Sequence, residues 1–486
     1  MALSTTRAIA ELQAQAEHPT FRRALGPAAP LAHLPPIRPF FLARGSRVLP
    51  PRHRTTGKAA MPGFPDTAPL RLRLLMMVVA ILLIEGVARL GLYVLATRGI
   101  HYEPITDTLP TEHRRVLERV LAGSTHYLDY DSTLGWTIRP GGREPPLYRA
   151  NAEGIRADHE YAPEPPPGVL RVAAFGDSFT HGDDVANPEA WTARLERPGI
   201  EVLNFGVAGY GLDQALLRYR REAKRHHPHV VLIGYMADDI ERAVSVYRPF
   251  YHPTSRAPLT KPRFRLVHDS LELVPNPMPS ERAYRALLDS PATVLPRLGE
   301  ADYYYHTMEH AGPLDALGTV RLGKLAWRMV RQSDGPEPNG TYNPRSEAFA
   351  VTVATMSEFV REVRADGATP VILLFPQAWD LGQYRRSHTR SYDPLRIALD
   401  RAGLPYLDVI EAFEGCRDRP VAALVPYHYS ALADDRVAAL LAARLDRHGI
   451  RATKARAKLP DCGAAATDGG PGVSGVIPLT APPAPP

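Results

Sequence analysis

From residue 170 onward, short apolar segments alternate with amphipathic ones, and this alternation limits the chain to few folds. The apolar segments have the length of strands, and the amphipathic segments have the length of helices. Candidate strands are 170–175, 201–203, 229–235, 370–375 and 405–409, and candidate helices lie near 188–196, 212–226, 345–365, 394–402 and 431–447. Strands and helices that alternate in this way build a parallel, doubly wound sheet with its functional site at the carboxyl ends of the strands. We therefore expect an α/β fold.

Residues 241–345 interrupt this alternation. Two short apolar runs, 264–267 and 271–274, flank His268-Asp269-Ser270 and predict a hairpin. A long insertion at the carboxyl edge of a sheet commonly becomes a lid over the site. A peripheral elaboration without substrate contact is the other possibility, and the sequence leaves both open.

A strongly apolar segment precedes this region. Residues 74–96 carry only two charges, Glu85 and Arg89. A helix of this length, at about 1.5 Å per residue, crosses a hydrocarbon core about 30 Å thick. The i, i+4 spacing lets the two charges pair, which lowers the cost of placing them in lipid. We expect a transmembrane signal anchor over 69–97. A buried core helix and a cleaved signal peptide are the alternatives, and the missing small-x-small cleavage site weighs against the second.

The charges that flank this segment predict its orientation. Residues 1–73 hold eleven Arg or Lys against three acids, whereas residues 97–120 are balanced. Positive charge stays on the cytoplasmic side of a membrane. The expected location is therefore the inner (cytoplasmic) membrane, crossed once, with the C-terminal domain in the periplasm.

Both ends of the chain have a composition that does not suit a packed core. Residues 1–68 lack a sustained apolar period, and 451–486 are rich in Ala, Pro and Gly, so we expect both to be disordered. Because Met61 lies just before the apolar segment, residues 1–60 can also reflect a start codon assigned too early. Between the anchor and the main domain, 98–165 form a turn-rich lead-in. The main domain is expected over 166–450.

Composition excludes several functional classes. The formal charge of +6 comes from scattered Arg residues that form no repeating basic face, so we expect no nucleic-acid partner. Cys416 and Cys462 are the only cysteines, too few for a zinc cluster. They form one bridge if the domain is exported, or remain two unpaired thiols. We expect no cofactor.

Four motifs carry chemical groups, and each follows an apolar run. Residues 172–182 read Val-Ala-Ala-Phe-Gly-Asp-Ser-Phe-Thr-His-Gly and place Ser178 in a turn that opens a helix, where backbone amides can stabilise an oxyanion. Alone, Gly-Asp-Ser is also an ordinary turn or helix cap. Residues 202–211 end in a glycine-rich turn that contains Gly209. The third motif places Asp238 after the strand at 229–235, and the fourth, 425–430, contains His428.

In this order, the four motifs resemble the blocks of the SGNH (GDSL) hydrolase superfamily, which carry Ser, Gly, Asn and His. The resemblance covers roughly residues 166–450, and the lead-in is similar to that of membrane-anchored bacterial members. It implies a three-layer flavodoxin-like fold and ester hydrolysis or acyl transfer, often on O-acetylated carbohydrate or lipid. By position, Ser178 matches the nucleophile and His428 the general base. Ser178, Gly209 and Asp238 match the oxyanion hole. His181 and Asp183 match no role.

The sequence departs from the family at two positions. Asp238 replaces an amide, and an ionised carboxylate would repel an oxyanion unless burial beside Asp239 keeps Asp238 protonated. Val425 stands where the family has the Asp that orients the histidine. We expect a backbone carbonyl to orient His428 instead, since any fixed acceptor selects the tautomer. Asp434 and Asp435 are expected to face solvent from the last helix.

These observations favour a membrane-anchored, extracytoplasmic serine esterase or O-acyltransferase that acts on an acyl ester of a polysaccharide or lipid. Because of Asp238 and Val425, a degenerate domain that binds glycan or scaffolds a surface-polysaccharide complex remains the alternative. A metal-dependent hydrolase is the least supported function, since His226-His227 and Asp238-Asp239 form no known ligand spacing, and we expect no metal.

Overall fold

The five predicted strands form one parallel sheet. Its order is β11-β10-β7-β5-β6. In chain order this is 5-4-3-1-2, the flavodoxin-like arrangement that the resemblance implies. The strands are β5 (Leu170–Gly176), β6 (Ile200–Gly206), β7 (Val230–Met236), β10 (Thr369–Phe375) and β11 (Tyr406–Asp408). The predicted fold class is therefore confirmed.

The computed structural model describes residues 69–255, 257–446, 449–450, 459 and 462. The predictions for 1–68 and for most of 451–486 lie outside the described residues. From Arg71 onward the chain forms one compact unit, which holds every element below except Leu70, the first residue of α3.

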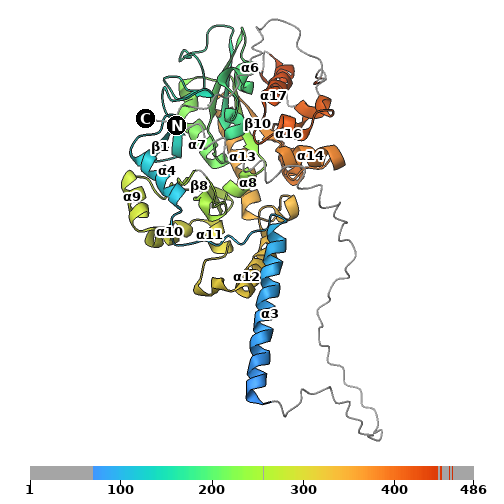
Figure 1. Ribbon diagram of the computed structural model, residues 1–486. Coiled ribbons are helices and arrows are strands. Elements are labelled where there is room, and N and C mark those ends of the chain that lie inside the picture. Colours follow the sequence, from blue (N-terminus) through green and yellow to red (C-terminus); the bar gives the residue numbers. More distant parts are fainter. Residues whose placement is uncertain (1–68, 256, 447–448, 451–458, 460–461, 463–486) are drawn as a thin grey trace, which may run out of the picture. The chain divides into compact units, whose positions relative to one another are not determined.

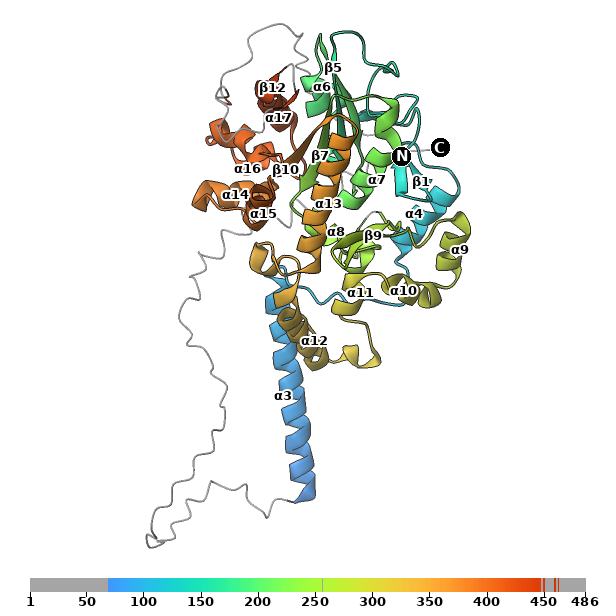
Figure 2. The same cartoon turned by 180° about the vertical axis from the view of Figure 1, so that it is seen from behind.

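Both faces of the sheet are buried, because side chains of one strand alternate between two hydrophobic clusters. Ala173 and Phe175 of β5 point into one cluster, and Val172 and Ala174 point into the other. The first cluster contains residues of α7 (Leu212–Glu222), α13 (Glu347–Ala365) and α15 (Asp393–Ala402). The second contains residues of α6 (Trp191–Leu195), α14 (Ala378–Ser387), α16 (Val421–Leu424) and α17 (Ala431–Arg444). Helices therefore cover both faces, as Figures 1 and 2 show.

The insertion after β7 begins with α8 (Asp239–Arg242) and contains the predicted hairpin. Its strands are β8 (Arg263–Val267) and β9 (Ser270–Val274), joined by His268 and Asp269, which both have positive φ. Four helices follow that the sequence pattern did not predict: α9 (Glu281–Asp289), α10 (Pro291–Gly299), α11 (Tyr303–Thr307) and α12 (Gly318–Arg331). At its end, the Tyr342 hydroxyl donates to the Ala237 carbonyl. This contact brings the insertion next to the end of β7.

The lead-in contains one helix and two small hairpins, which pack onto the main domain. They are α4 (Thr111–Leu121), β1 (Leu128–Asp131) paired with β2 (Gly135–Ile138), and β3 (Arg143–Glu144) paired with β4 (Tyr148–Arg149). Trp136 and Ile155 of this segment belong to the first hydrophobic cluster. The lead-in is therefore part of the core.

The apolar segment forms α3 (Leu70–Ala96), which is long and apolar enough to cross a membrane. Only 6% of its most apolar window is buried, so it is not the core helix of a soluble domain. Arg89 pairs with Glu85 as predicted, at 2.8 Å. The pair also contacts the insertion, because Glu85 accepts from the Gly318 amide and Arg89 donates to the Ala316 carbonyl.

Cys416 and Cys462 form a disulfide. Cys416 ends the turn segment that follows β11, and the Cys462 amide donates to the neighbouring Gly415 carbonyl at 3.2 Å. Of the two possibilities that the sequence left open, the structure has the bridge. The short pair β12 (Leu445–Asp446) and β13 (Gly449–Ile450) lies between α17 and Cys462 in the sequence.

Candidate functional site

Ser178 is the first residue of α5 (Ser178–His181), and only Asp177 separates it from β5. Asp177, not Ser178, caps this helix, because the Asp177 carboxylate accepts from the amides of Phe179 and Thr180 at 3.0 and 3.3 Å. Among the described residues, the Ser178 side chain forms no hydrogen bond, and it is buried at the end of the strand. A purely capping role for this serine is therefore excluded.

The turn before Ser178 needs a glycine. A Cβ added at Gly176 would lie 2.1 Å from the Thr180 hydroxyl and 3.0 Å from the Gly234 carbonyl of β7. The strand and the helix can approach this closely only without a side chain. This explains the glycine of Gly-Asp-Ser in physical terms.

His428 lies in the loop between α16 and α17, next to the residues on either side of Ser178. Its ring contacts the Phe179 ring, with centroids 5.4 Å apart. Its charge also interacts with that of Asp177. Within the described residues, no hydrogen bond joins His428 to Ser178 directly, and such bonds often form only with substrate bound.

The group that orients His428 is Asp184. Its carboxylate lies 2.7 Å from His428 Nδ1. The expectation that a backbone carbonyl at Val425 performs this role was wrong, since the partner of His428 Nδ1 is the Asp184 carboxylate. A carboxylate is the stronger acceptor, because it also stabilises the positive charge of the imidazolium.

Sequence reasoning missed Asp184 because it lies in a loop, six residues after Ser178, and not beside His428. Its φ of +68° places it in the left-handed region, which Asp tolerates better than most residues. The Asp184 amide donates to the Tyr148 hydroxyl at 2.8 Å. The signal available in the sequence was the unassigned acidic pair Asp183-Asp184, directly after the first block.

The pKa of His428 is raised from its usual value. Burial lowers it, but the hydrogen bond to Asp184 and the negative charges of Asp183, Asp184 and Asp177 together raise it more. The surroundings thus stabilise the imidazolium form of His428. A histidine that acts as a general base takes this form after it accepts a proton.

Arg156, from the lead-in, holds the loop that carries Asp184. This buried guanidinium donates to the carbonyls of His181, Gly182 and Val185 and to the Asn187 side chain. Four donations to one short loop fix its path. The lead-in therefore helps to fix the geometry of the site.

His181 lies beneath the same loop. Its Nδ1 is 2.5 Å from Asp183 and its Nε2 is 2.7 Å from the Tyr127 hydroxyl. Burial, with the nearby charge of Arg156, lowers the pKa of His181 to about 4. A neutral, fully engaged imidazole of this kind holds the loop in place.

Gly209 lies in the turn between β6 and α7, with a φ of +78° that favours glycine. The flanking residues are fixed, because Trp136 Nε1 donates to the Ala208 carbonyl and the Tyr210 hydroxyl donates to the Trp136 carbonyl. Among the described residues, the amides of Ser178 and Gly209 donate to no acceptor. Both amides are thus available to an oxyanion.

Asp238 follows β7 and its side chain is exposed. The burial on which its role as a protonated donor depended is therefore absent. Its neighbour Asp239 is the buried carboxyl, and burial raises the pKa of Asp239 well above its usual range. The oxyanion role of Asp238 stays a prediction.

Arg242 ties the ends of β5, β6 and β7 together. Its Nη1 lies 2.6 Å from Asp239, 3.7 Å from Asp177 and 2.6 Å from the Tyr210 carbonyl. These groups are buried, and the positive charge partly offsets the cost of placing two carboxyls together. The three loops that carry the first three motifs therefore share one buried cation.

The last helix corrects a further expectation. Asp434 is fully buried, whereas Asp435 is exposed, so only the second faces solvent as predicted. A Cβ at Gly182 would lie 3.4 Å from the Asp434 carboxylate, and burial raises the pKa of Asp434 well above its usual range. Asp434 thus packs against the loop between Ser178 and Asp184.

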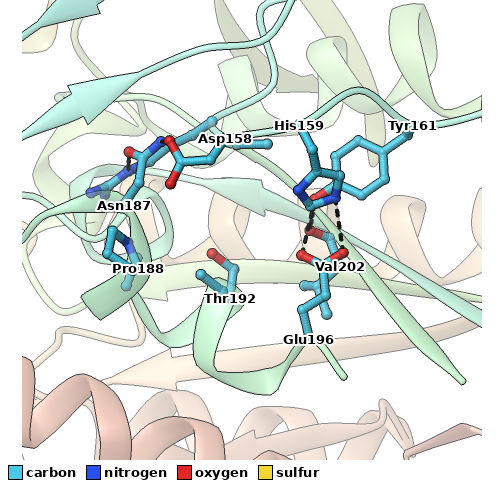
Figure 3. A pocket seen from close by; sticks show the side chains of 12 residues that line it. Asp158, His159, Tyr161, Asn187, Pro188, Thr192, Glu196 and Val202 are labelled. Atoms are coloured by element: carbon cyan, nitrogen blue, oxygen red, sulfur yellow. Dashed lines mark hydrogen bonds and ion pairs between the residues drawn. The ribbon is translucent and has the colours of Figure 1, made fainter. Parts of the chain in front are cut away.

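A cavity of about 330 Å³ is lined by Arg156, Asn187, His159 and Glu196, among others (Figure 3). Neither Ser178 nor His428 lines this cavity, so the cavity is not the site that contains these two residues. Among the described residues, no three His, Cys, Asp or Glu side chains form a group that could hold a metal ion.

No family model and no curated protein matches the sequence. Several solved structures are similar at low identity, and they include the following three. A lipolytic protein of the G-D-S-L family from Desulfitobacterium hafniense DCB-2 is 12% identical, with 55% of this chain and 95% of that one covered and a TM-score of 0.25. An acylhydrolase from Bacteroides fragilis NCTC 9343 is 13% identical, with 57% and 86% covered and a TM-score of 0.28. A gut microbial diltiazem-metabolizing enzyme is 11% identical, with 56% and 47% covered and a TM-score of 0.23.

The strand order and the placement of the four motifs define the fold. The first three motifs follow β5, β6 and β7 at one edge of the sheet, and the fourth brings His428 to the first. The chain therefore has the doubly wound α/β fold expected of an SGNH (GDSL) hydrolase.

Proposed function

We propose that this protein is a serine esterase or O-acyltransferase that uses Ser178, His428 and Asp184 as a catalytic triad. The observation that carries the proposal is the Asp184 carboxylate on His428 Nδ1, because it leaves the other ring nitrogen to accept a proton. The buried Ser178, which caps nothing, supplies the nucleophile.

In the proposed reaction, Ser178 Oγ attacks the acyl carbonyl while His428 Nε2 takes the hydroxyl proton. The amides of Ser178 and Gly209 donate to the developing oxyanion. The C–O bond of the ester then breaks, and the imidazolium gives its proton to the leaving alcohol. Water or an acceptor hydroxyl then attacks the acyl-enzyme while His428 takes its proton. The bond between Ser178 Oγ and the acyl carbon breaks, and the imidazolium returns the proton to Ser178 Oγ.

The proposed substrate is an acyl ester of a polysaccharide or a membrane lipid, and water or a sugar hydroxyl takes the acyl group. The proposed location is the outer side of the cytoplasmic membrane, with α3 as the anchor. Two observations support it: α3 exposes apolar side chains along its length, and Cys416–Cys462 is a bridge typical of oxidising compartments. The excess of positive charge before α3 supports the orientation.

A fluorophosphonate probe tests the proposed nucleophile directly. The purified wild type is expected to be labelled, and Ser178→Ala to be unlabelled. Thr192→Ser is a matched control, since it creates another buried serine, on α6, without altering Ser178. A well-folded wild type that takes no label would contradict the proposal.

One observation favours a second function, a degenerate domain that binds glycan without turnover. It is the exposed Asp238, which places a carboxylate where the family has an amide donor. A strain carrying Ser178→Ala separates the two functions, because a binding domain keeps its biological role in that strain and an enzyme loses it.

A further inference from the structure

The second half of α3 has two different faces. Ala88 is buried and Glu85 is half-buried, whereas Val87, Leu90 and Tyr93 expose 62 to 69% of their surface. The buried face meets the insertion, and the exposed face continues the apolar surface of the first half. In the second half of α3, one side therefore packs against the insertion, and the opposite side makes no contact with the described residues.

The insertion element that packs against α3 is α12. Leu317 at its N-cap offers no side-chain cap, and Glu85 caps the helix instead by accepting from the amides of Gly318 and Thr319 at 2.5 and 3.0 Å. A Cβ at Gly318 would lie 2.7 Å from Arg89 Cγ, so the two helices approach closely. Figures 1 and 2 both show α12 beside α3.

The depth of this contact follows from helix geometry. Glu85 lies near the middle of 74–96, about 17 Å along the helix from residue 74, whereas a hydrocarbon core is about 30 Å thick. If α3 spans the bilayer, α12 begins within the leaflet nearer to the sheet. The outward side of α12 must then meet lipid.

The composition of α12 and of the turn before it suits that location. Large apolar side chains are exposed there: Leu314 (64%), Leu317 (44%), Trp327 (61%) and Met329 (50%). Basic side chains alternate with them, and Arg331 stacks on the Trp327 ring at 5.6 Å. Exposed Trp next to Arg is typical of helices that lie at the lipid headgroups.

We propose that α12 and the preceding turn form a second membrane contact, in which Leu314, Leu317, Trp327 and Met329 contact lipid within the leaflet nearer to the sheet. The occupant of this surface is lipid because the Glu85–Gly318 contact holds the start of α12 against the part of α3 that lies inside the bilayer. The contact fixes the main domain relative to the membrane plane. The inference rests on the proposed anchoring by α3.

The test uses the full chain in vesicles of phosphatidylcholine and phosphatidylglycerol, with or without brominated acyl chains that quench tryptophan. The chain has four tryptophans, of which Trp136 and Trp191 are buried and Trp379 is exposed on α14. We expect brominated lipid to quench the wild type. Trp327→Phe should lose most of that quenching, while the matched control Trp379→Phe should keep it.

Three results would overturn the inference. Equal quenching of wild type and Trp327→Phe would place Trp327 away from lipid. Quenching of Trp327 by acrylamide alone would place it in water, and protection from both quenchers would place it in a protein contact. Washing the vesicles with alkaline carbonate separates this failure from that of the anchor: protein that remains bound but shows no lipid quenching refutes only the contact of α12, whereas protein that washes off refutes both.

Discussion

The Asp184 carboxylate lies 2.7 Å from His428 Nδ1, although 244 residues separate the two in the sequence. The bond raises the pKa of His428, together with the charges of Asp183 and Asp177 and against the effect of burial. Because a general base must be neutral, activity should fall as pH drops through this raised pKa.

Asp184→Asn should lower the pKa of His428, because it removes a charge that stabilises the imidazolium. The acidic limb of kcat/KM should therefore move to lower pH, and the plateau should fall by about tenfold or more. Asp435→Asn is the control, since Asp435 has a side chain of similar exposure, 54% against 52%. If the pH profile of kcat/KM is unchanged in Asp184→Asn, the bond to Asp184 does not set the pKa of His428.

Arg156→Lys should destabilise the protein by about 2–4 kcal/mol, because an ammonium cannot donate to all four acceptors of the loop and leaves some of them unpaired. It should also lower kcat, since Asp184 loses its fixed position. Denaturant unfolding and steady-state kinetics measure the two effects. Arg149→Lys, on the exposed strand β4, should change neither, and an unaffected Arg156→Lys enzyme would contradict the anchoring role.

Asp238→Asn should raise kcat by about tenfold or more, because an amide donates to an oxyanion that a carboxylate repels. Single-turnover acylation rates measure the change at the chemical step. Asp269→Asn in the hairpin turn is the matched control, since it makes the same substitution on an exposed residue of the insertion. An unchanged rate in Asp238→Asn would exclude this position from the oxyanion hole.

Cys462→Ser should lower the free energy of unfolding by roughly 2–4 kcal/mol, because the bridge closes a loop of 46 residues in the unfolded chain. Thermal unfolding in the absence of reductant measures the loss. With reductant present, wild type and variant should unfold at the same temperature. A difference that persists under reductant would show that Cys462 contributes through packing and not through the bridge.

The sheet could be predicted from the sequence because each strand is a short apolar run buried on both faces. The blocks of Ser178, Gly209 and Asp238 followed, since parallel strands place their carboxyl ends at one edge. Asp184 could not be predicted, because its role depends on a left-handed loop that Arg156 holds from the lead-in. The pattern of neighbouring residues in a sequence does not indicate such a contact between distant segments.

The same limit explains two other differences. Asp434 was expected to face solvent because it stands beside Asp435 in a helix, but it is buried against the loop after Ser178. Glu85 pairs with Arg89 as expected, and it also caps α12, 233 residues away, which the sequence did not predict. In both cases a charged residue contacts a segment that is distant in the sequence.

The acyl-enzyme itself tests the central claim most directly. The protein is mixed with p-nitrophenyl acetate, quenched in acid and digested, and the peptide that contains Ser178 is weighed by mass spectrometry. We predict one acetyl group on Ser178 in the wild type, slower acetylation in Asp184→Asn, and none in Ser178→Ala. Ester turnover by the wild type without an adduct on Ser178, or with the adduct on another residue, would contradict the account.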